Sequence, residues 1–116
     1  MSNQGEYRFD VEFLEESLKF LEKLDEKTQE KVLENIRVSR FKNDSRLLKK
    51  IDKDIWEFRS QYKSQQIRLL AFWDKERKSL IVCAHGFIKK TQKIPSRELS
   101  KAKNIRLKYL NSNRKS

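Results

Sequence analysis

The sequence has 116 residues, which suits one small domain with a single core and leaves no room for a second domain. Charged residues make up 39% and hydrophobic residues 36%, but the apolar residues recur in periodic clusters, which favours folding over disorder. The single cysteine, Cys83, lies in an apolar run, so we expect a small buried hydrophobe and no internal disulfide. No segment approaches the roughly 20 apolar residues of a transmembrane helix or has the layout of a secretion signal, which predicts a soluble cytoplasmic protein.

The net charge of +11 is spread unevenly along the chain. Residues 1–36 carry 5 basic and 10 acidic side chains, whereas residues 85–116 carry 10 basic and 1 acidic. Such asymmetry indicates a basic surface on one side of the protein that binds a polyanion. The alternative is a protein that is merely basic and soluble, or one with a basic tail.

The first half of the chain predicts one strand and two helices. Residues 6–11 alternate as in a short strand, and apolar residues at helical spacing predict an amphipathic helix over about residues 12–24. Asp25 and Thr28 are both plausible N-caps of a second helix that carries Val32 and Ile36 on one side. The connection is so short that the two helices should form an antiparallel hairpin.

The second half predicts three strands and a helix. Apolar segments at 51–59, 65–73 and 79–87 are joined by short polar connections, as in an antiparallel meander. Ser96 is a suitable N-cap for a last helix, and residues 111–116 should form a disordered basic tail. The expected fold is therefore a single α+β domain, residues 1–110, in which the N-terminal strand, the helical hairpin and the C-terminal helix pack on a small, mostly antiparallel sheet, with the helices against one face.

The common signatures of enzymes are missing. Two glycines cannot form a glycine-rich phosphate loop, and one histidine with one cysteine does not make a zinc site. Cys83 and His85 are two apart on one predicted strand and would share a face, but the apolar surroundings of the cysteine argue against a nucleophilic pair. We therefore expect no metal and no cofactor.

Cations and aromatic rings are interleaved around the three predicted strands. Lysine and arginine bind phosphates and flat rings stack on unpaired bases, a combination suited to single-stranded RNA. The aromatic residues of strands are also commonly part of a core, so each ring could either stack on a base or pack in the core. The residues expected to bind RNA are Lys49, Lys50, Lys89, Lys93, Trp56 and Phe87.

Three segments resemble the phage-derived branch of the HigB/RelE toxins. They are Ile55–Arg59, Ile67–Trp73 and above all His85–Pro95, which are similar to the family patterns L-W-E-L-R, Y-R-I/V-L-Y-F and H-G-F-x-K-K-T-Q-K-T-P. The resemblance covers about residues 7–110. Here Phe58 and Ile94 replace the usual Leu and Thr, and the Tyr that is common before Arg68 is absent.

This resemblance implies a RelE-like fold and a toxin of a type II toxin–antitoxin system. Such toxins are metal-independent endoribonucleases, many acting on mRNA in the ribosome, in which the ribose 2′-oxygen attacks the adjacent phosphate. The reaction needs a base, cationic support for the phosphate and an acid for the leaving oxygen. The implied partners are mRNA, the ribosome and a helix-turn-helix antitoxin. The catalytic candidates are Arg59 and Arg68 as phosphate cations, His85 as general acid or base, and Lys90.

Two other functions stay open at this point. The same basic surface could serve a non-catalytic RNA- or DNA-binding module, which would bind in a salt-sensitive way without cutting. The chain could also be a degenerate toxin that only binds its antitoxin, an idea that the missing Tyr before Arg68 leaves open.

Overall fold

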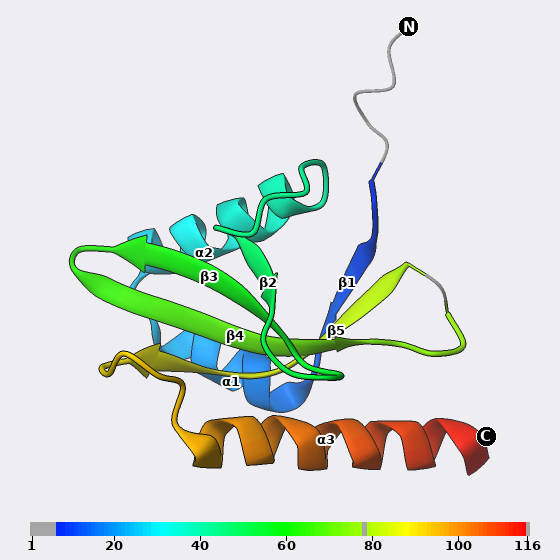
Figure 1. The fold of residues 1–116 in the computed structure, drawn as a ribbon. Helices are drawn as coiled ribbons and strands as arrows, with labels where there is room; N and C mark the ends of the chain where they lie inside the picture. Colours follow the sequence, from blue (N-terminus) through cyan, green and yellow to red (C-terminus); the bar gives the residue numbers. More distant parts are fainter. Residues whose placement is uncertain (1–6, 78, 116) are drawn as a thin grey trace, which may run out of the picture.

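The computed structural model describes residues 7–77 and 79–115 (Figure 1). Along the chain, a strand and a helical hairpin come first, followed by a run of strands and a long helix. The elements are β1 (Asp10–Phe13), α1 (Glu15–Lys23), α2 (Glu26–Ser39), β2 (Leu48–Lys50), β3 (Trp56–Tyr62), β4 (Gln65–Trp73), β5 (Leu80–Lys89) and α3 (Ser96–Lys115).

The five strands form one sheet in the order β1-β5-β4-β3-β2. Only β1 and β5 are parallel; the other neighbours are antiparallel. A tight turn at Lys63 and Ser64, both at positive φ, joins β3 to β4, as a two-residue hairpin of type I′ requires. The α+β fold with a mostly antiparallel sheet, an N-terminal strand and a C-terminal helix is therefore confirmed.

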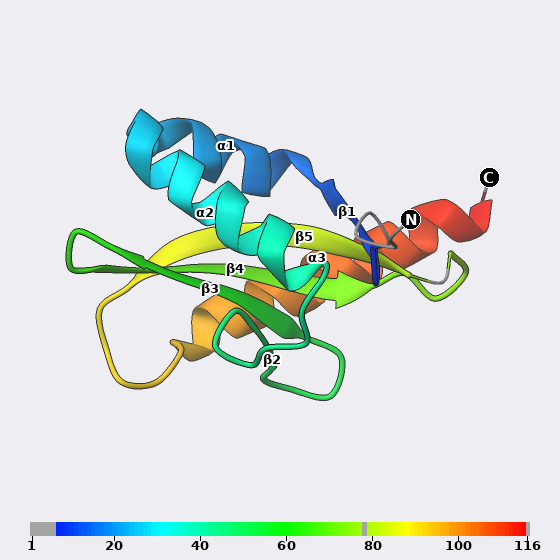
Figure 2. The same ribbon diagram turned by 90° about the horizontal axis from the view of Figure 1, so that it is seen from above.

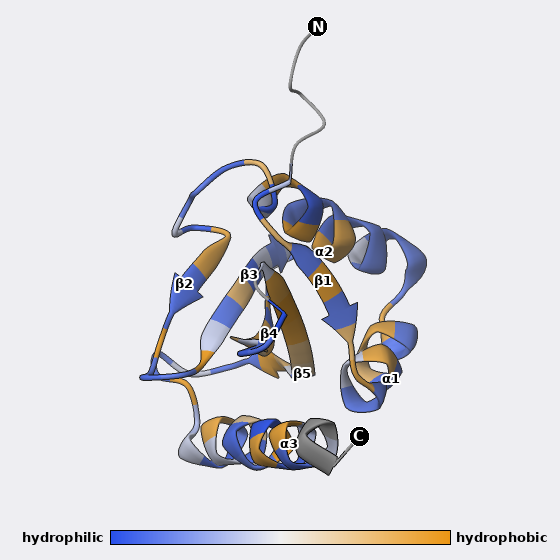
Figure 3. Cartoon of the chain, turned by 90° about the vertical axis from the view of Figure 1, so that its right-hand side faces the viewer, coloured by the Kyte–Doolittle hydropathy of each residue, from blue (hydrophilic) through white to orange (hydrophobic). Residues whose placement is uncertain are grey.

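The helices cover both faces of the sheet. The hairpin of α1 and α2 lies on one face, and α3 crosses the other (Figures 2 and 3). Alternation along the strands accordingly fills two cores: Phe58, Leu69 and Cys83 belong to the core under the hairpin, whereas Leu70 and Ala102 belong to the core under α3. The expectation that all helices lie against one face was wrong, because the strands are apolar on both sides and each side needs a cover.

A β-bulge changes the alternation within β5. The register pairs Leu70 with His85 but the next residue, Ala71, with Cys83, so Ala84 is the extra residue. Cys83 consequently packs under the hairpin, whereas His85 contacts α3. The two side chains do not share a face, contrary to the expectation from a regular strand, and burial also raises the pKa of the Cys83 thiol.

Several element boundaries differ from those expected. β1 begins at Asp10, and residue 6, where the strand was expected to start, lies outside the described residues. β3 begins at Trp56, and the short edge strand β2 was not anticipated. α3 extends to Lys115, so residues 111–115 are helical where the sequence suggested a disordered tail over 111–116, and residue 116 lies outside the described residues. Within the described parts of the chain, no helix is long and apolar enough to span a bilayer.

Candidate nucleic-acid interface

Two arginines are placed side by side by strand register. Arg59 of β3 and Arg68 of β4 are directly paired across the antiparallel ladder, and Phe87 of β5 lies opposite Arg68 on the other side. Directly paired residues point to the same face of a sheet, here the face of α3. The β3–β4 hairpin therefore brings the side chains of both arginines to one place.

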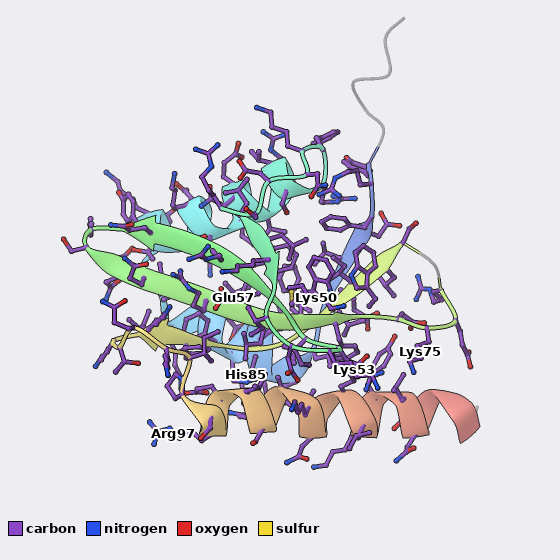
Figure 4. The ribbon with its side chains drawn as sticks, in the orientation of Figure 1. Lys50, Lys53, Glu57, Lys75, His85 and Arg97 are labelled. Carbon is purple, nitrogen blue, oxygen red and sulfur yellow. The ribbon has the colours of Figure 1, made fainter. Side chains whose placement is uncertain are left out.

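Glu57 lies on the same face, two residues before Arg59, and touches both arginines. Its Oε1 is 3.3 Å from Arg59 Nε and its Oε2 is 3.5 Å from Arg68 Nε, and only 3% of the residue is exposed. Figure 4 shows its side chain in the middle of the sheet. Sequence reasoning missed this residue, although a charged residue in a mostly apolar strand, in phase with Arg59, was a usable signal.

Arg68 is held from several sides. Its Nη1 donates to the backbone oxygen of Ile67 at 3.0 Å, and its Nη2 donates to Gln66 Oε1 at 3.0 Å. Burial lowers the pKa of the guanidinium, and the Glu57 carboxylate opposes that effect. Arginine remains protonated at neutral pH even so, so Arg68 supplies a fixed positive charge beneath the surface. The side chain of Arg59 is 31% exposed and can meet a ligand directly.

Two grooves adjoin this arginine pair. The basic groove, about 830 Å³, runs from the β3–β4 hairpin to the end of β5 and the following loop, and Lys89, Lys90 and Gln92 form its far wall. The amide groove, about 360 Å³, lies between β3, α2 and the segment before β2. Arg59, Gln66 and Arg68 line both grooves, so they lie where the two grooves adjoin.

The predicted lysines do not all gather here. Lys89 and Lys90 line the basic groove, and Lys89 pairs directly with Gln66. Lys93 is exposed in the loop before α3 but does not line either groove. Lys49 shares a face with Glu57, its partner in the ladder, whereas Lys50 pairs with Trp56 on the opposite face.

The two predicted base-stacking rings are largely buried. Trp56 is partly buried and packs against the core under the hairpin, with its ring 6.2 Å from that of Trp73 and nearly perpendicular to it. Phe87 is 8% exposed, belongs to the core under α3, and lies 6.2 Å from the His85 ring. The structure therefore places Trp56 on the face away from the arginines and Phe87 on the same face as Arg68.

His85 lies between the sheet and the first turns of α3 (Figure 4). It is 2% exposed, its Nε2 is 3.0 Å from the backbone oxygen of Glu98, and its Nδ1 is 3.7 Å from Glu98 Oε1. Burial lowers the pKa of the imidazole, and the backbone of Glu98 only partly offsets this. His85 is not among the residues that line the two grooves.

The chemistry that this arrangement supports is the binding and polarisation of a phosphodiester. Guanidinium groups bind phosphate through paired donors, and the lysine ammonium groups extend the positive surface along the basic groove. Across residues 7–77 and 79–115, no three His, Cys, Asp or Glu side chains are grouped so that they could hold a metal ion.

The fold is that of the RelE toxins. A double arginine-to-alanine mutant of E. coli toxin RelE in the free state matches with a TM-score of 0.51 and 18% identity, covering 67% of this chain and 80% of RelE. A chain of the intact E. coli RelBE toxin–antitoxin complex matches with a TM-score of 0.51 and 16% identity, covering 72% of this chain and 99% of its own length.

The sequence itself identifies the family. Residues 19–107 match the family described as Phage derived protein Gp49-like (DUF891), and the chain belongs to that family. No curated protein matches the sequence. This membership confirms the resemblance to a phage-derived family that the strand and loop motifs indicate, and the structural matches confirm the RelE-like fold.

Proposed function

We propose that this chain is the toxin of a type II toxin–antitoxin system and that it cleaves mRNA without a metal, through attack of the ribose 2′-oxygen on the neighbouring phosphate. The observation that carries the proposal is the junction of Arg59 and Arg68 beside the lysines of the basic groove. Membership of the Gp49-like family and the RelE-like fold support the toxin assignment.

Each residue of the junction has a task in such a reaction. The phosphate gains negative charge in the transition state, and preorganised cations stabilise it most where water is displaced. Arg59, the more exposed of the pair, would contact the phosphate, while buried Arg68 would reinforce the positive potential from behind. Glu57 would hold both guanidinium groups in place.

The proposal assigns proton transfer to Lys90 and not to His85, the general acid or base that the sequence suggests. His85 is buried against Glu98 and does not line the grooves, so we assign it to the junction of β5 with α3. Lys90, exposed in the wall of the basic groove, is the candidate to protonate the leaving 5′-oxygen. Lys89 would hold the RNA backbone next to it.

The proposed setting is ribosome-bound mRNA in the cytoplasm, with a helix-turn-helix antitoxin as the silencing partner. The E. coli RelBE complex is an assembly of a toxin with its antitoxin, and a chain with 28 basic and 17 acidic residues would attract an acidic antitoxin segment through long-range electrostatics.

The test is induced expression of the chain in a bacterial host, with primer extension on translated mRNA. We expect growth arrest and new 5′ ends within coding regions, and both should disappear in Arg59→Ala. Arg37→Ala is the matched control, because Arg37 is an exposed arginine of α2 paired with Glu34 and should leave cleavage intact. Purified protein with and without programmed ribosomes then decides the ribosome dependence.

Two results would refute the proposal. Growth arrest with intact mRNA would exclude RNA cleavage as its cause. Binding of RNA that weakens with salt but produces no cut ends, in the presence and in the absence of ribosomes, would identify a non-catalytic binding module instead.

A further inference from the structure

The amide groove and the basic groove are both lined by cations, carboxamides and one aliphatic side chain, and the amide groove differs in that its carboxamides lie beside an open strand edge. Asn35 of α2 and Ser60 and Gln61 of β3 form its inner side, and Asn35 Nδ2 is 3.2 Å from Ser60 Oγ. Leu47 adds an apolar surface, and the cations Lys31 and Arg46 complete the lining. Carboxamides and a leucine are not needed to bind a phosphate. A nucleotide also has a ring with polar edges, which these side chains can contact.

The backbone of β3 is open at this groove. β2 pairs with β3 only as far as Phe58, and one more bond joins Arg59 N–H to the Leu47 oxygen at 2.8 Å. No other strand in the described part of the chain continues along that edge. Because N–H groups of alternate residues point to the same side of a strand, the N–H and C=O of Gln61 face the groove. The edge therefore offers a donor and an acceptor in fixed positions.

The position of the groove is as informative as its lining. Arg59, Gln66 and Arg68 are shared with the basic groove, so a phosphate at the arginine pair would have one neighbouring nucleotide on each side. On the basic side, Lys89 and Lys90 stand beside the carboxamides of Gln65 and Gln92, and the two lysines contact phosphates without reading sequence. On the other side the wall is carboxamide and strand edge, which are the groups that proteins use to read the edges of bases.

We propose that the amide groove is a specificity pocket for one unpaired nucleobase, next to the phosphate that Arg59 and Arg68 hold. Asn35 and Gln61 read the edge of that base, Leu47 packs against it, and Lys31 and Arg46 face the next phosphate. This inference rests on the proposed function for the identity of the polymer, but the pocket itself binds a mononucleotide whether or not the protein cleaves RNA.

The first experiment measures binding alone by NMR, with labelled wild-type protein titrated with AMP, CMP, GMP, UMP and ribose 5-phosphate. We expect ribose 5-phosphate to shift signals near Arg59 and Lys90, and at least one mononucleotide to shift the amides of Asn35 and Gln61 as well and to bind more tightly. Asn35→Ala and Gln61→Ala should each weaken binding of that nucleotide by about tenfold and leave ribose 5-phosphate unchanged. Asn104→Ala, at an exposed helical position of α3, is the matched control.

The second experiment maps RNA cut sites for the same proteins. Asn35→Ala and Gln61→Ala should relax the base preference at one position next to the cut and still cut RNA, and Asn104→Ala should keep the wild-type preference. If wild type cuts no RNA but binds one base selectively, the proposed function fails and the pocket stands. If all four mononucleotides bind like ribose 5-phosphate, or if cleavage persists with unchanged preference in both variants, the pocket assignment is overturned.

Discussion

Replacement of Glu57 by alanine tests whether the arginine pair depends on a buried counter-charge. Glu57 is 3% and Arg68 4% exposed, so the alanine variant would leave the Arg68 charge inside the protein with only neutral partners. Breaking a buried pair from one side costs about 3–5 kcal/mol, a large part of the roughly 5–15 kcal/mol that stabilises a small domain. We expect the free energy of unfolding, measured by urea denaturation, to fall by about that amount.

Two further variants separate charge from shape. Glu57→Gln keeps the side-chain volume and one acceptor oxygen, so its loss should be smaller than that of Glu57→Ala. In Glu57→Ala combined with Arg68→Met, both buried charges are gone, and most of the lost stability should return. Glu34→Ala is the control, because Glu34 pairs with Arg37 on the exposed surface of α2. A loss in Glu57→Ala no larger than in Glu34→Ala would refute the reasoning.

Three other predictions concern the fold around the site. Gly86→Ala should lower the free energy of unfolding by about 1–3 kcal/mol, because an added Cβ would collide with the Phe20 ring and come within 2.7 Å of Leu69 Cδ2; an unchanged urea midpoint would contradict the packing of α1 on β5. Ser64→Gly should raise the free energy of unfolding by about 0.5–1 kcal/mol, because relief of the left-handed conformation at φ 67° exceeds the extra entropy that glycine loses on folding; thermal denaturation with no gain would contradict this. Burial lowers the pKa of His85, so the unfolded chain binds a proton more readily below about pH 6.5; stability should therefore decrease as pH falls from 7.5 to 5, and His85→Gln should flatten this decrease in denaturation curves collected across that range.

The fold was largely predictable because its signals are local. Periodicity located both hairpin helices and the central strands, and β4 begins and ends at the expected residues, Gln65 and Trp73. The Asp25 side chain accepts a hydrogen bond from the Thr28 N–H at 2.8 Å, which decides between the two candidate caps. What failed was the assignment of layers, since an apolar strand that is buried on both faces has no alternation to show which helix covers which side.

The site was predictable only in part, for a comparable reason. Arg59 and Arg68 were placed together because a short hairpin fixes its own register. The sequence does not show which of the loop lysines and His85 reach the site. For His85, the face of the sheet depends on one extra residue in β5, Ala84. Asn35 reaches Ser60 through packing of α2 on the end of β3, and no local pattern encodes that contact.

The irregularity in β5 also sets a length requirement on the strand. With regular alternation from Cys83 onward, Lys89 would point with Cys83 toward the helical hairpin; the additional residue turns it to the side of Gln66, its partner in the ladder. A deletion at Ala84 should therefore do more than loosen a core, because it would rotate every later position of the strand by half a repeat. We accordingly expect sequences of this family to vary in residue type at position 84. The number of residues between Leu80 and Lys89 should stay constant among them.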